Sequence, residues 1–137
     1  MTSQTFVGEQ VSVRAARRFV NDHLARHGID ASVATLLTSE LASNVVQHAC
    51  TDFDITVTVD KDIVRVEIHD GIAVSEAFRD LIDNPPLAVE ATSVRGRGLL
   101  LVGATATRFG LTDKGPRGKA LWFEIARPEK TPQPATH

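Results

Sequence analysis

Apolar residues near the start of the chain recur with a helical period. Val13, Ala16, Val20 and Leu24 are spaced by three or four residues, which places them on one face of a helix. Ser12 precedes this face and has the side chain of a typical N-cap, so the pattern predicts a helix from Ser12 to about residue 27. Gly28 would end it, and Asp30 would cap a second helix.

The second helix has its own apolar face, and three polar residues border that face. The apolar positions are Val33, Leu36, Leu37, Leu41 and Val45. Glu40, Asn44 and His48 follow one another at four-residue intervals and therefore stack along one side of the helix. Polar groups at the edge of a core cost free energy unless they are hydrogen-bonded, ionically paired or in contact with water. Two interpretations stay open, namely a solvated polar stripe and a binding site.

The remaining apolar residues alternate with polar ones, which is the period of β-strands. Asp60-Lys61-Asp62 is a tight turn between two such runs and predicts an antiparallel hairpin whose second strand leads into Asp70-Gly71. Strands are expected over residues 5–9, 53–59, 63–68, 107–112 and 119–126, the last two joined by the loop 115–118.

The pattern is weaker between residues 71 and 95. A short helix is expected over residues 75–82, before Pro85-Pro86. Such a stretch is typical of a lid or a binding loop. Residues 99–104 are continuously apolar and predict a buried helix.

Helices with apolar faces and strands joined mainly by hairpins indicate an α+β protein. The expected architecture is a two-layer α/β sandwich, in which helices cover one face of a mixed, mostly antiparallel sheet. Its 137 residues suit one domain, which we expect over residues 5–126. A Pro-rich tail at residues 127–137 has little to bury and is expected to be disordered.

Composition narrows the class of protein without naming it. Hydrophobic residues make up 42% of the chain, charged residues 23%, and the net charge is −2. That charge gives no electrostatic reason to expect nucleic acid or an anionic membrane as a partner. No apolar run reaches membrane-spanning length, so a cytoplasmic protein is expected. The single cysteine, Cys50, is expected to be a buried apolar residue.

Three separate stretches offer chemistry that fits one purpose. Gly96-Arg97-Gly98 stands just before a predicted helix, where glycines allow close approach and free amides favour phosphate. Asp70 can accept hydrogen bonds from an exocyclic amine, and Gly71 leaves space beside it. Asn44 offers an amide oxygen suited to Mg²⁺, and Glu40 can take a proton from an attacking hydroxyl or water.

The order of these stretches resembles the GHKL (Bergerat-fold) ATP-binding superfamily, and within it the small bacterial anti-sigma-factor serine/threonine kinases. The matching stretches are Glu40-Leu-Ala-Ser-Asn-Val-Val-Gln-His-Ala, Val66-Glu-Ile-His-Asp-Gly, Arg95-Gly-Arg-Gly-Leu-Leu-Leu-Val and Gly118-Lys-Ala-Leu-Trp-Phe-Glu-Ile. The resemblance spans nearly the whole chain.

The resemblance implies a role for each matching residue. Asn44 would coordinate a Mg²⁺ ion that bridges the phosphates of ATP, and Glu40 would be the general base. Asp70, beside Gly71, would recognise the adenine amine. The glycine motif, with its residues Arg95, Gly96, Arg97, Gly98 and Leu99, would form the hinge of a lid and contact the phosphates. His48 would lie near the phosphates.

Two departures from the family pattern keep a second function open. The family's aspartate motif is Asp-x-Gly-x-Gly, whereas Asp70 is followed directly by Gly71 and then by Ile72 and Ala73. The family's last strand often carries a threonine near the adenine site, whereas this chain has Lys119-Ala120.

The leading hypothesis is an ATP- and Mg²⁺-dependent serine/threonine kinase that sequesters a sigma factor and phosphorylates an anti-anti-sigma-type partner. The alternative is a non-catalytic, partner-binding regulatory module with a degenerate nucleotide site. The catalytic part of a histidine kinase is less favoured, because no phosphoacceptor hairpin precedes the first strand. The free edge of that strand makes a homodimer plausible. Arg14, Arg17 and Arg18 are either a solvated surface or a partner contact.

Overall fold

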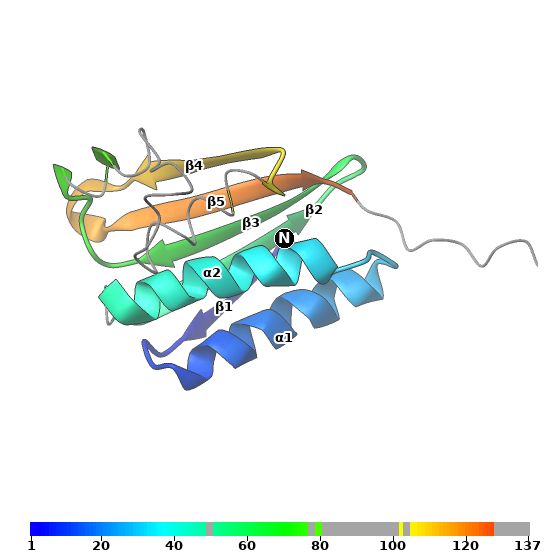
Figure 1. The fold of residues 1–137 in the computed structure, drawn as a ribbon, viewed down its shortest axis with the longest axis horizontal. Helices are drawn as coiled ribbons and strands as arrows, with labels where there is room; N and C mark the ends of the chain where they lie inside the picture. Colours follow the sequence, from blue (N-terminus) through cyan, green and yellow to red (C-terminus); the bar gives the residue numbers. More distant parts are fainter. Residues whose placement is uncertain (49–50, 77–78, 81–101, 103–104, 128–137) are drawn as a thin grey trace, which may run out of the picture.

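The computed structural model describes residues 1–48, 51–76, 79–80, 102 and 105–127. Two helices cover one face of a five-stranded sheet with strand order β1–β2–β3–β5–β4 (Figure 1). Each pairing between neighbouring strands is antiparallel. The elements are β1 (Thr2–Phe6), α1 (Val11–Arg26), α2 (Ser32–His48), β2 (Phe53–Val59), β3 (Ile63–Asp70), β4 (Arg108–Asp113), the 3₁₀ turn η1 (Gly115–Arg117) and β5 (Lys119–Ala126). The expected two-layer α+β sandwich is confirmed.

The first helix forms where the apolar period predicted it, but its start differs. Ala16, Val20 and Leu24 are fully buried, as expected. Gln10, and not Ser12, is at the N-cap of α1, and no side-chain cap bond forms there among the described residues. Ser12 lies inside the first turn and is buried, because it is four residues before Ala16 and so belongs to the inner face.

The connection to the second helix follows the prediction. Gly28 has φ +68°, a left-handed conformation that favours glycine after a helix. The Asp30 carboxylate accepts a hydrogen bond from the backbone N–H of Ser32 at 2.9 Å, which satisfies one amide at the start of α2.

The inner face of α2 is narrower than the sequence predicted. Leu37, Leu41 and Val45 are buried, whereas Val33 and Leu36 are 36% and 45% exposed. The expectation that all five pack inward was therefore wrong for two of them. Val33 and Leu36 lie on a neighbouring strip of the helix, in line with Glu40, and this strip stays partly open to solvent.

The central hairpin matches its prediction closely. Strands β2 and β3 pair from Phe53↔Asp70 to Val59↔Val64. The carboxylate of Asp60 closes the turn by accepting hydrogen bonds from the backbone N–H groups of Ile63 at 2.7 Å and Asp62 at 2.8 Å. These bonds hold the pKa of Asp60 below its usual value, since they favour the ionised form.

The first strand lies earlier in the sequence than expected. β1 spans Thr2–Phe6, and its register on β2 ends at Phe6↔Phe53, where the two rings stack with centroids 5.5 Å apart. The prediction of residues 5–9 was wrong because β1 ends at Phe6, and the backbone at Gly8 lies against that of Thr51. A Cβ on Gly8 would lie 2.3 Å from the carbonyl oxygen of Thr51, so the backbones meet there too closely for a side chain.

The last hairpin forms as predicted, with β4 at the sheet edge and β5 between β3 and β4. Val102 is helical and fully buried, but most of the predicted helix 99–104 lies outside the described residues. The same holds for Cys50, for most of the helix expected over residues 75–82, and for the tail from residue 128. Within the described part, no helix combines the length and apolarity needed to cross a membrane.

Candidate functional site

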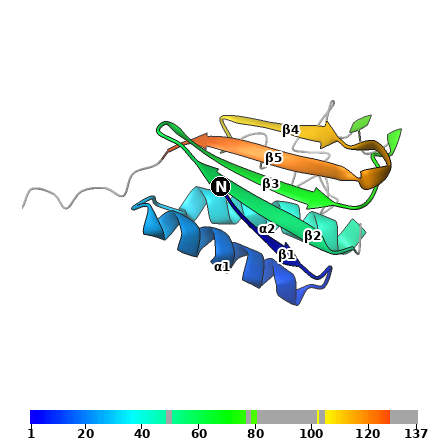
Figure 2. The ribbon, with the colours of Figure 1, turned by 180° about the vertical axis from the view of Figure 1, so that it is seen from behind.

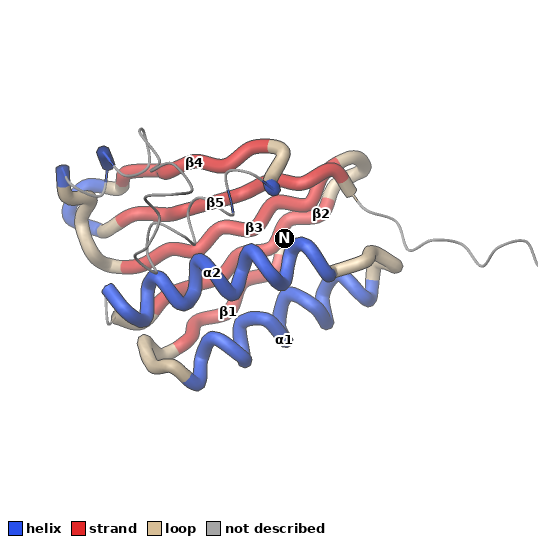
Figure 3. The backbone as a smooth tube through the Cα atoms, viewed as in Figure 1, coloured by secondary structure: helices blue, strands red, loops and turns tan. Residues whose placement is uncertain are grey.

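The described candidate residues come from two elements that end at the same side of the molecule. Asn44 and Glu40 lie in the second half of α2, and Asp70 is the last residue of β3. The C-terminal end of α2, the tip of β3 and the start of β5 lie together at one end of the sandwich in both ribbon views (Figures 1 and 2). The tube in Figure 3 shows that the loop after β3 leaves from this end.

Asn44 carries a buried amide oxygen without a partner. The residue is 8% exposed, and its Oδ1 accepts no hydrogen bond from the described residues. An unsatisfied buried acceptor costs about 1–3 kcal/mol. Thr38 and Ser39, earlier on the same helix, also bury unpartnered hydroxyls, but Asn44 is the residue near the end where β3 stops.

Glu40 lies one helical turn before Asn44 and is half-buried. It stands at the border between the buried face of α2 and the exposed strip that carries Leu36. The position expected from the sequence, at the edge of the apolar face, is therefore confirmed. A carboxylate there keeps contact with solvent while it lies on the same side as Asn44.

Asp70 is held by a buried ion pair. Its side chain is 3% exposed, and that of Lys119 8%; the Lys119 ammonium lies 3.0 Å from Asp70 Oδ1. The same Oδ1 accepts the backbone N–H of Ile72 at 2.8 Å. Lys119 also donates to the carbonyl oxygen of Ile72 at 3.2 Å. Lys119 thus ties the end of β3 to the turn that follows it.

Two glycines flank this ion pair, and they differ in what surrounds them. Among the described residues, no atom lies within 4 Å of the place where a Cβ on Gly71 would stand. At Gly118 a Cβ would lie 1.9 Å from the carbonyl oxygen of Asp70, and φ is +108°. The close approach of backbone to Asp70 is therefore made by Gly118 of the neighbouring strand connection.

Lys119 and Gly118 are the residues of this site to which the sequence assigned no role. The signal that could have found them is register, because an antiparallel neighbour of β3 places some residue opposite Asp70, and that residue is Lys119. The order of strands was needed first, since β5 follows β3 in space but not in sequence.

The remaining candidates lie outside the described residues. They are Arg95, Gly96, Arg97, Gly98 and Leu99. His48 is the last residue of α2, and its side chain is not among those described. Their proposed contacts with phosphate stay predictions.

The part of the site that is described fits a magnesium–nucleotide complex. No cluster of three or more His, Cys, Asp or Glu residues that could hold a metal alone occurs among the described residues. Mg²⁺ does not require one, because it binds through one or two protein oxygens, water and substrate phosphates. The unpartnered Oδ1 of Asn44 is an oxygen of the required kind.

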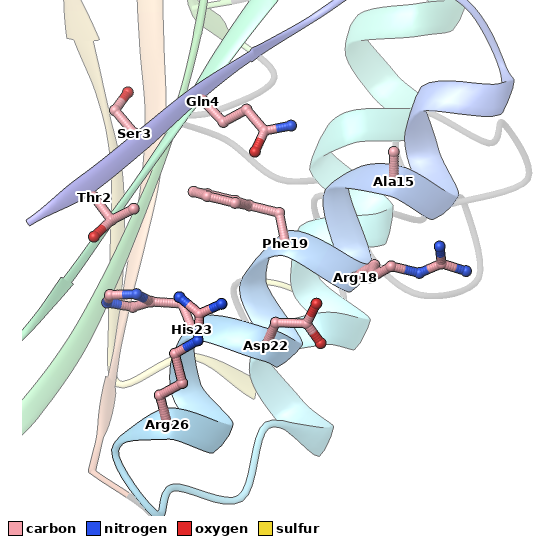
Figure 4. Close-up of a pocket in the computed structure, with 9 residues that line it drawn as sticks. All are labelled: Thr2, Ser3, Gln4, Ala15, Arg18, Phe19, Asp22, His23 and Arg26. Atoms are coloured by element: carbon pink, nitrogen blue, oxygen red, sulfur yellow. The ribbon is translucent and has the colours of Figure 1, made fainter.

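A hollow lies between β1 and α1. Its volume is about 470 Å³, and Figure 4 shows the ring of Phe19 pointing from α1 toward β1. The lining includes Thr2, Ser3, Gln4, Arg18, His23 and Arg26. None of the residues selected from the sequence as site residues lines it.

Comparisons with known proteins agree with this geometry. The family model described as "Histidine kinase-like ATPase domain" matches residues 6–125. Two nucleotide-free crystal forms of the catalytic domain of histidine kinase ThkA have a similar fold, each with 14% sequence identity and a TM-score of 0.55 over 93% of this chain and 97% or 99% of theirs. No curated protein sequence matches significantly. The chain belongs to the family of histidine kinase-like ATPase domains.

Proposed function

We propose that this chain binds ATP with Mg²⁺ at the end of the sandwich where α2 and β3 stop. The observation that carries the proposal is the buried, unpartnered Oδ1 of Asn44, one turn after Glu40 and at the same end of the fold as Asp70. A polar atom in that state is stabilised by a ligand that supplies the missing contact. Membership of the ATPase-domain family supports the same nucleotide.

Each described side chain then has one task. Asn44 would hold a Mg²⁺ ion through Oδ1, and the ion would supply neutralisation of the phosphate charge. Asp70 accepts a hydrogen bond from the exocyclic amine of adenine. Glu40 takes the proton of the attacking hydroxyl while that oxygen bonds to the terminal phosphorus and the bond to the leaving ADP breaks.

The finer proposal is a serine/threonine kinase of the anti-sigma type. It would phosphorylate an anti-anti-sigma-type partner and sequester a sigma factor. It is supported by the resemblance of the Glu40–Ala49 stretch and of the Gly118–Ile125 stretch to those kinases. Phosphoryl transfer needs mainly positioning and charge neutralisation. Glu40 and Asn44, on one side of α2, would supply the positioning, and a Mg²⁺ ion held by Asn44 would supply the neutralisation.

Calorimetric titration with ATP and ADP, with and without Mg²⁺, tests nucleotide binding. We expect binding that depends on Mg²⁺ and an affinity at least about ten-fold lower in Asn44→Ala, a loss of about 1.4 kcal/mol. Asn21→Ala, which removes an exposed asparagine of α1, is the matched control. Unchanged Mg-ATP affinity in Asn44→Ala contradicts the proposed site.

The catalytic role is tested separately. Glu40→Ala should bind Mg-ATP but fail to transfer phosphate to a cognate partner, whereas Glu9→Ala, which removes an exposed carboxylate, should do both. Transfer at the wild-type rate by Glu40→Ala excludes Glu40 as the base.

One observation favours a second function, that of a non-catalytic module that binds a partner. The carboxylate expected to receive the adenine amine already pairs with the Lys119 ammonium. If this pair closes the base site, no nucleotide binds at millimolar concentration, which means a binding free energy weaker than about −4 kcal/mol. A partner complex that forms equally well without nucleotide would then support the module.

A further inference from the structure

We infer that Lys119 determines which purine base the site accepts, by keeping Asp70 an acceptor of hydrogen bonds. The inference rests on the proposed binding of a nucleotide with its base against Asp70. It concerns a residue of β5 that contacts the aspartate and not the phosphates. Lys119 is therefore a specificity-determining residue, and Asp70 is the group that touches the base.

Asp70 and Lys119 form an ion pair of opposite charges. Asp70 and Lys119 are both buried, and their charged groups are 3.0 Å apart. A carboxylate in such a place stays ionised when an opposite charge and a backbone N–H stabilise it. Lys119 supplies the charge, and the N–H of Ile72 supplies the second contact at 2.8 Å.

The two carboxylate oxygens of Asp70 differ in their contacts. Both the ammonium of Lys119 and the N–H of Ile72 contact Oδ1 of Asp70. Among the described residues no hydrogen bond uses Oδ2. The space beside Gly71 holds no atom of the described residues within 4 Å of the place where a Cβ would stand. Oδ2 is therefore the acceptor that remains for a base entering next to Gly71.

Purine bases differ in whether the 6-position donates or accepts a hydrogen bond. An ionised carboxylate only accepts hydrogen bonds. A 6-amino purine presents an N–H donor at this position, whereas a 6-oxo purine presents a carbonyl oxygen, which is an acceptor. Two acceptors facing each other in a buried site leave both unsatisfied. The pair therefore selects adenine over hypoxanthine and guanine.

Removal of the ammonium abolishes this preference. A buried carboxylate without a cation takes up a proton in place of remaining charged. The protonated acid has an O–H donor as well as an acceptor oxygen, so it can face either base. Lys119 thus sets the direction of the hydrogen bond without contacting the nucleotide itself.

The test is the ratio of the affinities for ATP and ITP, which differ at the 6-position of the base, measured by calorimetry with Mg²⁺. We expect the wild-type chain to bind ATP about ten-fold or more tightly than ITP, as for one hydrogen bond to a charged group. Lys119→Met should bring the ratio close to one. Lys119→Arg keeps the positive charge and should therefore keep the preference for ATP over ITP. Lys114→Met changes an exposed lysine of the same strand connection and should leave the ratio unchanged.

A loss of packing alone would weaken both nucleotides equally and leave the ratio unchanged, so an undiminished ratio in Lys119→Met overturns the inference. If that variant does not fold, Asp70→Asn/Lys119→Met removes both charges together and avoids an unpaired one. The side-chain amide at position 70 of this double variant can donate or accept a hydrogen bond, so we expect a ratio of ATP to ITP affinity near one. A ratio as high as that of the wild type overturns the inference. A wild-type chain that binds neither nucleotide refutes the proposed function itself, whereas one that binds both equally refutes only the role of Lys119.

Discussion

Two buried polar residues define the site at the scale of single side chains, and they are stabilised in different ways. Asp70 has its charge balanced by Lys119, whereas Asn44 has an amide oxygen that nothing in the described residues satisfies. The charge of Asp70 is balanced without a ligand, whereas the amide oxygen of Asn44 lacks a partner among the described residues. We therefore expect Asn44 to respond to metal and nucleotide, and the Asp70–Lys119 pair to contribute to the stability of the empty chain.

Removal of one member of the Asp70–Lys119 pair should lower the stability of the fold. Lys119→Met leaves the Asp70 carboxylate buried without its cation, and breaking a buried pair in this way costs about 3–5 kcal/mol. The free energy of unfolding, measured by denaturant titration, should fall by about that amount. Asp70→Asn/Lys119→Met removes both charges and should lose much less, since neither is then left unpaired. Equal losses in the single and double variants would show that packing, and not charge pairing, stabilises this corner.

At the scale of elements, the junction of β3 and β5 is set by a glycine. Gly118 directly precedes β5, and its backbone lies against the carbonyl of Asp70. The register pairs Asp70 with Lys119, so the close approach at Gly118 and the ion pair are consecutive along β5. A side chain at position 118 would separate the two strands where the site begins.

Gly118→Ala and Gly115→Ala compare two glycines with positive φ that differ in the room left for a side chain. Both glycines have positive φ, +108° and +62°. A Cβ on Gly118 would lie 1.9 Å from the carbonyl oxygen of Asp70, whereas a Cβ on Gly115 would meet no atom of the described residues within 4 Å. Gly115→Ala should cost about 1–2 kcal/mol, the penalty of a left-handed residue. Gly118→Ala should cost more and also weaken Mg-ATP binding, because the strand end that carries Asp70 must shift. Denaturant titration and calorimetry measure both effects. Equal losses of stability, with equal nucleotide affinity, would contradict this account.

At the scale of the whole molecule, the helical layer and the sheet also face each other between α1 and β1. His23, on α1, lies beside the hollow next to β1. Partial burial lowers its pKa first, and the positive charges of His27, the amino terminus and Arg26 lower it further. The folded chain therefore holds this proton less tightly than the unfolded chain does.

This difference makes global stability depend on pH. Because the unfolded chain binds the proton of His23 more readily, its contribution to stability is fully present above the ordinary histidine value of 6.5 and declines as the pH falls through the lowered pKa. His23→Gln should flatten this part of the curve of unfolding free energy against pH. Curves for the wild type and His23→Gln that stay parallel between neutral and mildly acidic pH would exclude His23 as the source.

The sequence by itself determined the elements and the kind of chemistry. Helical and alternating periods located both helices and both hairpins, because apolar residues must face one core, and the Glu40–Asn44 spacing placed both side chains on one side of α2. Only the packing of the helix on the sheet selects which apolar residues are buried, since Val33 and Leu36 share the helical spacing but are exposed. The tertiary structure also decided the partner of Asp70. Lys119 is 49 residues away along the chain, and only the pairing of β3 with β5 brings its ammonium to the carboxylate. Local patterns carry periodicity and capping, whereas the environment of a buried charge depends on strands that are distant in sequence.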